Sequence, residues 1–258
     1  MTNKTKQLGQ NFLIDNNIIN KEIKRADVLE SQIILEIGGG KGILTEALLQ
    51  KAKKVICIEL DKELFVHLKK KFQKQIQAKK LQLIQGDCLD VQIPYFDKCV
   101  ANIPYSISSP LIFRLLKFKK PMYFMVQKEF AQRLFTKRGD KNYSSLGAVC
   151  SIYFDGHICF NVSKNVFRPV PKTDSAFVKL IPKEKIILSK KDEKKFISFL
   201  RHIFCHKKQN IKKTILNTGL FSKEKIEKIE NEFTMTMKTY KFSAEEIYEI
   251  YKRLDVLG

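Results

Sequence analysis

The residues Asn102-Ile-Pro-Tyr105 combine groups that could hold a flat molecule bearing an amino group. The Asn102 amide oxygen is a hydrogen-bond acceptor, and the Ile103 carbonyl cannot be tied into a helix because Pro104 follows. Tyr105 offers a flat ring on which a base could stack. An Asn-x-Pro turn with a buried tyrosine is also common turn chemistry, so the tetrad alone leaves both interpretations open.

A glycine-rich turn occurs earlier in the chain. Residues 33–37 form an apolar run typical of a buried strand, and helical spacing of apolar residues resumes over 43–50. Between them, Gly38, Gly40 and Gly42 allow tight backbone close to a ligand. A strand, a glycine turn and a helix in this order are typical of a nucleotide-binding corner, although glycines that only satisfy turn geometry are the alternative.

Two acidic residues each follow a predicted strand. Glu59 closes the apolar run 54–59 and follows Gly38 by about 20 residues, the spacing at which a βαβ unit places a carboxylate on ribose hydroxyls. Asp87 follows the run 81–85, at the edge where open α/β sheets bind ligands, and could bind the exocyclic amine of an adenine. A surface glutamate and an ordinary Gly-Asp turn are the alternatives.

The segments that must position these residues alternate between strands and helices. We expect a helix over residues 14–23, strands over 33–37, 54–59, 81–85, 96–101 and 122–127, helices over 43–50, 61–77, 111–116 and 128–135, and later strands over 146–154, 157–162 and 175–181. This order predicts an α/β fold with a doubly wound sheet in residues 1–182.

After Pro182 the composition changes to charged helices, which predict a small helical domain over residues 183–258. One expected helix carries an apolar stripe that includes Phe196 and Phe204. The lysines outside this stripe could form a solvated face or an RNA-facing one. Ser243-Ala-Glu-Glu246 is a capping box that opens the last helix.

Charge is the outlying property of the composition. The chain of 258 residues has 48 Lys and Arg against 27 Asp and Glu, a net charge of +21. Such a field attracts nucleic acid, although a lysine-rich solvated surface is the alternative.

Six scattered cysteines without C-x-x-C spacing predict no metal site. Without an apolar run of about 18 residues or a signal peptide, we expect a soluble protein in a reducing compartment.

Taken in order, several motifs resemble those of the small-subunit ribosomal RNA adenine dimethyltransferases. They are Gln10-Asn-Phe-Leu13, Glu36-Ile-Gly-Gly-Gly-Lys-Gly42, Glu59, Gly86-Asp87 and Asn102-Ile-Pro-Tyr105, and the likeness continues in Ile107-Ser-Ser-Pro110, Gln127-Lys-Glu-Phe130, Pro169-Val-Pro-Lys-Thr-Asp-Ser175 and residues 204–216. It therefore covers almost the whole chain. Gln127-Lys-Glu-Phe130 and Tyr143-Ser-Ser-Leu146 look closer to the archaeal and eukaryotic branch of the family.

The resemblance implies a Rossmann-like class I methyltransferase sheet, S-adenosylmethionine as methyl donor, and a role in small-subunit biogenesis. Two adjacent adenosines near the 3′ end of small-subunit ribosomal RNA would each be methylated twice. By similarity, Asn11 and Leu13 close over the donor, Gly38 and Gly40 meet its methionine portion, Glu59 holds the ribose, Asp87 reads the adenine, and Asn102 faces both donor and target. The expected catalytic residues are Asn102, Ile103, Pro104 and Tyr105. We expect a monomer that acts in the cytoplasm, or in the nucleolus if the cell has a nucleus.

Two departures from the family pattern and three alternatives accompany this interpretation. The family often has proline where this chain has Gly39, and glycine in its place would loosen the loop. The family also usually has more arginine than residues 206–210 of this chain contain. The alternatives are a macrolide-resistance methyltransferase acting on large-subunit RNA, an RNA-binding assembly factor without catalysis, and a Rossmann dehydrogenase. The dehydrogenase would require Gly-x-Gly-x-x-Gly, whereas this turn reads Gly38-x-Gly40-x-Gly42.

Overall fold

The computed structural model describes residues 11–189 and 191–256. The described residues divide into two compact units, one formed by 11–131 with 156–182 and the other by 132–155 with 183–189 and 191–256. Residues 132–155 thus join the C-terminal helices, whereas the expected boundary placed them with the sheet. The physical reason is that the helix in this segment, α8 (Ser145–Tyr153), packs against α9 (Glu193–Cys205) and α12 (Ala244–Val256).

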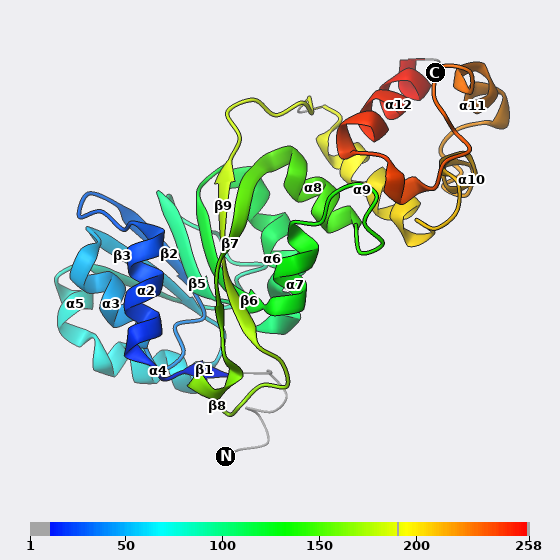
Figure 1. The fold of residues 1–258 in the computed structure, drawn as a ribbon. Coiled ribbons are helices and arrows are strands. Elements are labelled where there is room, and N and C mark those ends of the chain that lie inside the picture. Colours follow the sequence, from blue (N-terminus) through cyan, green and yellow to red (C-terminus); the bar gives the residue numbers. More distant parts are fainter. Residues whose placement is uncertain (1–10, 190, 257–258) are drawn as a thin grey trace. The chain divides into compact units, whose positions relative to one another are not determined.

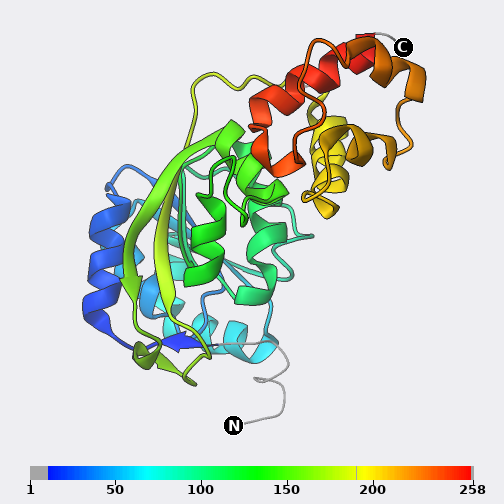
Figure 2. The same cartoon turned by 45° about the vertical axis from the view of Figure 1, so that its right-hand side comes forward.

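A mixed sheet of seven strands organises the first unit (Figure 1). Its order is β4 (Leu81–Gln85), β3 (Lys54–Glu59), β2 (Ile33–Ile37), β5 (Lys98–Asn102), β6 (Met122–Gln127), β9 (Ser175–Pro182) and β7 (Phe154–Val162). The strands β4 to β6 are parallel to one another, and β9 runs antiparallel to β6. Figure 2 shows β9 and β7 side by side along this edge of the sheet.

The strand order reverses beside β2. From β2 the chain moves outward to β3 and β4 and then returns to β5 on the other side of β2. In open α/β sheets, a ligand crevice forms at such a reversal, outside the carboxyl ends of the strands. The fold therefore places a crevice where the glycine turn, Glu59 and Asn102 are found.

Six helices accompany the sheet of the first unit, and α2 among them is clearly amphipathic, with one buried face. They are α2 (Asn16–Ala26), α3 (Ile43–Lys51), α4 (Lys62–Lys71), α5 (Gln73–Gln77), α6 (Ser108–Leu115) and α7 (Lys128–Leu134), which ends in the second unit. Asp15 begins α2 by accepting hydrogen bonds from the backbone N–H groups of Asn17 and Ile18. One apolar core joins Ile19 and Leu48 of α2 and α3 to strand residues such as Val55.

Most expected elements are confirmed, including the strands over 33–37, 54–59, 81–85 and 122–127. The expected helix over 61–77 is interrupted at Phe72, between α4 and α5. The expected strand over 146–154 is wrong, because α8 occupies this segment. The Ser144 hydroxyl caps α8 by accepting the Gly147 N–H, and nearly every residue of the helix is buried, so the sequence shows no helical alternation.

The second unit is helical and contains α8, α9, α10 (Ile211–Leu216), α11 (Lys223–Ile229) and α12. Its core gathers Phe196 of α9 with Tyr248 and Tyr251 of α12, with ring centroids 4.9 and 5.4 Å from that of Phe196. The capping box is confirmed, because Ser243 N–H donates to Glu246 Oε2 at 2.7 Å and Glu246 N–H donates to Ser243 Oγ at 3.2 Å. Within the described ranges, no helix is long and apolar enough to cross a membrane.

Candidate active site

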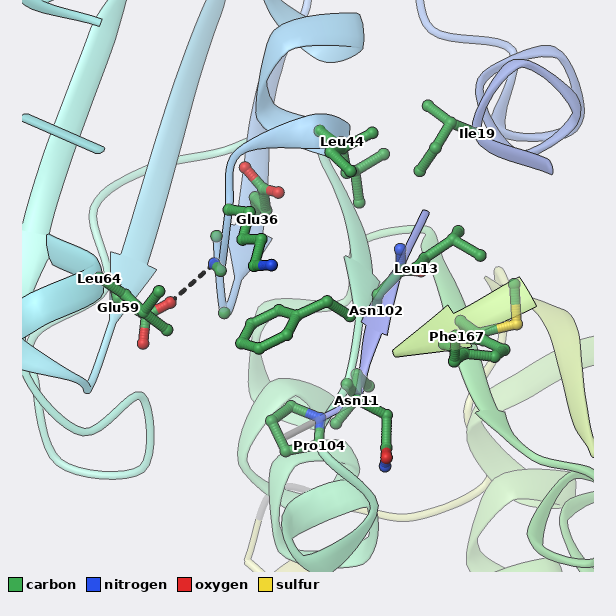
Figure 3. A pocket seen from close by; sticks show the side chains of 18 of the residues that line it. Asn11, Leu13, Ile19, Glu36, Leu44, Glu59, Leu64, Asn102, Pro104 and Phe167 are labelled. Atoms are coloured by element: carbon green, nitrogen blue, oxygen red, sulfur yellow. Dashed lines mark hydrogen bonds between the residues drawn. The ribbon is translucent and has the colours of Figure 1, made fainter. Parts of the chain in front are cut away.

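A pocket opens at the carboxyl ends of β2, β3 and β5 (Figure 3). Its lining includes these residues expected from the sequence: Asn11, Leu13, Gly38, Gly40, Glu59, Asn102, Ile103, Pro104 and Tyr105. Asp87 lines an adjoining pocket that shares Gly38, Glu59 and Pro104 with the first. The structure thus brings together all the site residues that the sequence predicted, at the strand-order reversal.

The glycine turn after β2 has a backbone that other residues rarely adopt. Gly38, Gly40 and Gly42 have φ angles of +75°, +54° and +80°. A Cβ on Gly40 would also lie 3.2 Å from the ring of Phe12. Glycine at this position therefore permits both the turn and the close approach of the N-terminal strand.

That N-terminal strand, β1 (Phe12–Leu13), forms one wall of the pocket. It pairs antiparallel with β8 (Phe167–Arg168), and the Ile14 N–H donates to the Val166 carbonyl at 3.0 Å. The sequence analysis expected no strand at Phe12 or Phe167 and missed this pairing, because the partners lie more than 150 residues apart in the sequence, as Phe12 and Arg168 show. The pairing holds Leu13 against the site.

Glu59 is fixed at the end of β3. Its side chain is 3% exposed, and its two carboxylate oxygens accept the N–H groups of Gly40 and Asp61, each at 2.9 Å. Figure 3 shows the bond to the glycine turn. Burial raises the pKa of Glu59 above its ordinary value, although these two N–H donors oppose the rise. Since a carboxylate oxygen has two lone pairs, each can still accept a ligand hydroxyl.

The loop that carries Asp87 is held in place by a residue that the sequence analysis did not identify. Arg114 of α6 donates to the Val91 carbonyl at 2.6 Å and also to the Leu89 carbonyl. Asp87 Oδ1 accepts the Leu89 N–H at 2.8 Å. The adjoining pocket also has apolar walls, with Ile37, Ile58, Leu60 and Ile107. A carboxylate beside apolar walls suits a flat ring that carries a hydrogen-bond donor.

The tetrad Asn102–Tyr105 lies where the two pockets meet. Asn102 Oδ1 is buried and has no hydrogen-bond partner among the described residues. Tyr105 has its hydroxyl 2.7 Å from Ser175 Oγ of β9, a contact that fixes the position of the ring, and burial raises the pKa of Tyr105. A buried acceptor without a partner costs free energy unless a ligand supplies the donor. The tetrad therefore offers an acceptor and a ring to a bound molecule.

Two further carboxyls in this region are buried, and one of them, Glu36, lines the first pocket. Glu36 of β2 is 1% exposed, and burial raises its pKa to about 8. Glu22 of α2 is fully buried, and burial raises its pKa well above the ordinary value. The sequence analysis gave Glu22 no role. One signal was available, since Glu22 interrupts the apolar face of α2 between Ile19 and Ile23.

In the described residues, no group of three His, Cys, Asp or Glu side chains could hold a metal ion. Four of the six cysteines, Cys57, Cys88, Cys99 and Cys150, are buried, where a free thiol packs as a small apolar group. The linings of the two pockets offer an amide oxygen, two strand-end carboxylates, a ring and a glycine turn.

Known proteins resemble this chain over most of its length. The family model described as Ribosomal RNA adenine dimethylase matches residues 1–256. The probable ribosomal RNA small subunit methyltransferase A of Methanosarcina acetivorans is 40% identical over 211 residues, which are 81% of this chain and 77% of that protein.

Solved structures show the same likeness. The crystal structure of a dimethyladenosine transferase from Plasmodium falciparum superposes with a TM-score of 0.80 and 33% identity, covering 94% of this chain and 98% of that one. The 23S rRNA methyltransferase ErmE superposes with a TM-score of 0.69 and 25% identity, covering 95% and 100%. Both values are lower for ErmE, which favours the first structure as the nearer relative. On the match of the family model and the identity to its members, the chain belongs to the ribosomal RNA adenine dimethylase family.

Proposed function

We propose that this protein transfers methyl groups from S-adenosylmethionine to the exocyclic amines of adenines in small-subunit ribosomal RNA. Two adjacent adenosines near the 3′ end are the proposed acceptors, each methylated twice. The observation that carries the proposal is the buried Oδ1 of Asn102, which has no hydrogen-bond partner among the described residues and belongs to a lining residue of the first pocket, in a chain of this family. An adenine amine supplies the donor that this oxygen lacks.

The residues around the first pocket fit the methyl donor. Glu59 would accept its ribose hydroxyls, and Asp87 would accept from its adenine amine. Gly38 and Gly40 would leave room for its methionine portion, under a cover that includes Leu13 and Asn11. When bound, this molecule supplies an electrophilic methyl group on a sulfonium sulfur.

The tetrad would prepare the target amine. The lone pair of an adenine amine is delocalised into the ring, which makes the nitrogen a poor nucleophile. Asn102 Oδ1 and the Ile103 carbonyl would accept hydrogen bonds from its two N–H groups and favour a tetrahedral nitrogen, while Tyr105 stacks on the flipped base. No strong general base is required, because the methylated cationic nitrogen is acidic enough to lose a proton to solvent. After the first transfer one proton remains, so the pocket must also admit a methyl group.

The RNA contacts are proposed on charge. The net charge of +21 favours a polyanion, and we propose that the helices of residues 183–258 face RNA, whereas the catalytic residues belong to the sheet unit. We propose that the protein acts as a monomer. A ribosomal substrate would place it in the cytoplasm, or in the nucleolus of a nucleated cell. An assembly role performed alongside methylation is compatible with the same residues.

The test uses labelled S-adenosylmethionine and undermethylated small subunits, followed by mapping of the modified adenosines. The expected label lies at two adjacent adenosines near the 3′ end. Label confined to large-subunit RNA would instead support a macrolide-resistance type of activity. Asn102→Ala should abolish transfer while donor binding stays measurable by calorimetry, and methylation retained in this variant would contradict the role given to Asn102.

A further inference from the structure

We propose that the first unit has a second RNA-binding surface, on the edge formed by the amino ends of its parallel strands. We call this surface the amino edge. It consists of the exposed ring of Tyr95 and three pairs of lysines, Lys53–Lys54, Lys79–Lys80 and Lys119–Lys120. Its partner is small-subunit ribosomal RNA, at a place away from the methylated adenosines. The inference rests on the proposed function, which supplies this RNA.

The topology of the sheet brings the three lysine pairs to one edge. Each pair lies at, or just before, the start of a parallel strand, namely β3, β4 or β6. Since β2 to β6 are parallel, their starts share one edge of the sheet, and the pocket lies at the opposite edge. The lysines are therefore gathered on the side of the sheet that the catalytic residues do not occupy.

Backbone hydrogen bonds hold the neighbouring strand starts together. The Val55 N–H donates to the Lys80 carbonyl at 2.9 Å, which joins the starts of β3 and β4. The Cys99 N–H donates to the Pro121 carbonyl at 2.9 Å, which joins the starts of β5 and β6. With β2 between β3 and β5, the amino edge spans about 20 Å at the usual spacing of strands.

Positive charge dominates the amino edge. Its lysines are exposed or half-buried, and none of them forms a salt bridge with another described residue. The acids near these strand starts are Asp27 and Glu30 before β2 and Asp97 before β5. Six lysines against three acids leave a positive field, which attracts phosphate groups.

Tyr95 adds a flat ring to this charge. The residue is 65% exposed, and Lys120 Nζ lies 4.7 Å from the centroid of its ring. Its hydroxyl donates to Asp97 Oδ1 at 2.6 Å, and Asp97 Oδ2 accepts the Ile33 N–H at 2.8 Å, so the ring is held at the strand starts. Lysines for phosphates and an exposed ring for a base are the combination that binds single-stranded RNA. A lysine face that serves only solubility would not need an anchored ring.

The length of the strands separates the amino edge from the pocket. Strands of five or six residues, such as β2 and β3, put the two edges about 17 to 20 Å apart. RNA on the amino edge is therefore a different segment from the one that carries the target adenosines. This surface should strengthen binding of the small subunit without acting on the transfer step.

The first test removes three charges from the amino edge with the combined changes Lys53→Gln, Lys80→Gln and Lys120→Gln. The matched control removes three charges from the exposed surface of α4 in the same unit, with Lys62→Gln, Lys69→Gln and Lys70→Gln. Affinity for undermethylated small subunits is measured at several salt concentrations.

We expect the amino-edge variant to bind about tenfold or more weakly near physiological salt. The slope of log affinity against log salt should become less steep by about 2 to 3, because about one unit is lost for each phosphate contact. The α4 control should stay within about threefold of the natural chain and keep its slope. For methylation, the amino-edge variant should have a raised KM for small subunits, with kcat and donor affinity unchanged.

The second test concerns the ring. Tyr95→Ala should weaken binding of small subunits about 5- to 100-fold, the effect of one lost base stack. Tyr95→Phe is the control, because it keeps the ring and loses only the bond to Asp97, and it should stay within about threefold of the natural chain.

Unchanged affinity in the amino-edge variant, or equal losses in that variant and the α4 control, would overturn the inference, since net charge alone would explain equal losses. A loss seen with intact subunits but not with protein-free small-subunit RNA would also overturn it, because the partner would then be a ribosomal protein. If the natural chain binds small subunits through the amino edge but leaves their adenosines unlabelled, the proposed function fails while the RNA contact remains.

Discussion

Glu59 accepts the backbone N–H of Gly40 at 2.9 Å, so the end of β3 and the glycine turn after β2 are joined across the mouth of the pocket. The second oxygen of the same carboxylate accepts the N–H of Asp61, the residue that caps the N-terminus of α4. One side chain therefore orders two loops and presents its remaining lone pairs to the pocket. This double role makes Glu59 sensitive even to a conservative change.

Glu59→Gln should weaken donor binding about 10- to 100-fold. The amide can satisfy one of the two backbone N–H donors, but its Nε2–H groups would then face the other. Calorimetry with S-adenosylmethionine measures the loss. Glu46→Gln is the control, because Glu46 lies on the surface in an ion pair with Lys71 and should leave the affinity unchanged. Equal affinities for the natural chain and Glu59→Gln would contradict the ribose-binding role.

Glu36 should make the protein less stable as the pH rises. Its folded-state pKa of about 8 exceeds the ordinary value near 4.5, so the folded state binds more protons than the unfolded state between these limits. The free energy of unfolding therefore falls across this range, by at most about 1.4 kcal/mol per pH unit from this group. Below about pH 4.5 the group is protonated in both states and adds no slope.

Glu36→Gln removes that group, so its stability relative to the natural chain should increase from pH 5 to pH 8. Urea unfolding at several pH values checks this, with Glu46→Gln again as the exposed control. Glu22, whose pKa is also raised, acts in the same direction and will leave part of the slope in the variant. A constant difference between the two proteins across the range would show that Glu36 is ionised in the folded state.

Gly39 shows how a departure from a family pattern is compensated. The sequence suggested that a glycine in place of proline loosens the loop. In the structure, a Cβ at Gly39 would lie 2.5 Å from Cys57 Sγ and 2.8 Å from Leu68 Cδ1, so neighbouring side chains already fill the space. The tight packing around Gly39 therefore limits the backbone freedom that this position would otherwise gain by lacking a proline ring.

Gly39→Ala should therefore lower the free energy of unfolding by about 1 to 3 kcal/mol through overpacking. Combining it with Cys57→Ala removes the nearest atom, and the pair should be less destabilising than the sum of the single changes. Thermal or urea unfolding of the four proteins completes the cycle. Strict additivity would mean that the backbone moves away from Cys57 instead.

Strands such as β2 and β3 were predictable because each is a buried apolar run that ends at a turn or an acid, and the expected site residues were found because they follow strand ends. Segment 145–153 was predicted wrongly, since an apolar run buried on all sides has neither the helical nor the strand period. The pairing of β1 with β8 could not be predicted, because Phe12 and its partner Arg168 lie far apart in the sequence and only the fold brings the two strands together.

Two variants of Tyr105 can distinguish two parts of its proposed role. One part is the stacking of its ring on the target base, and the other is the contact of its hydroxyl with Ser175. Its hydroxyl contacts Ser175 Oγ at 2.7 Å, whereas its ring lines the pocket. Tyr105→Phe keeps the ring and loses only this contact, so we expect the single-turnover rate to fall several-fold, the effect of one hydrogen bond. Tyr105→Ala also removes the stacking surface, worth about 1 to 3 kcal/mol per base, and should slow transfer about 10- to 100-fold further with donor affinity unchanged. Equal rates in the Phe and Ala variants would mean that the target base does not stack on this ring.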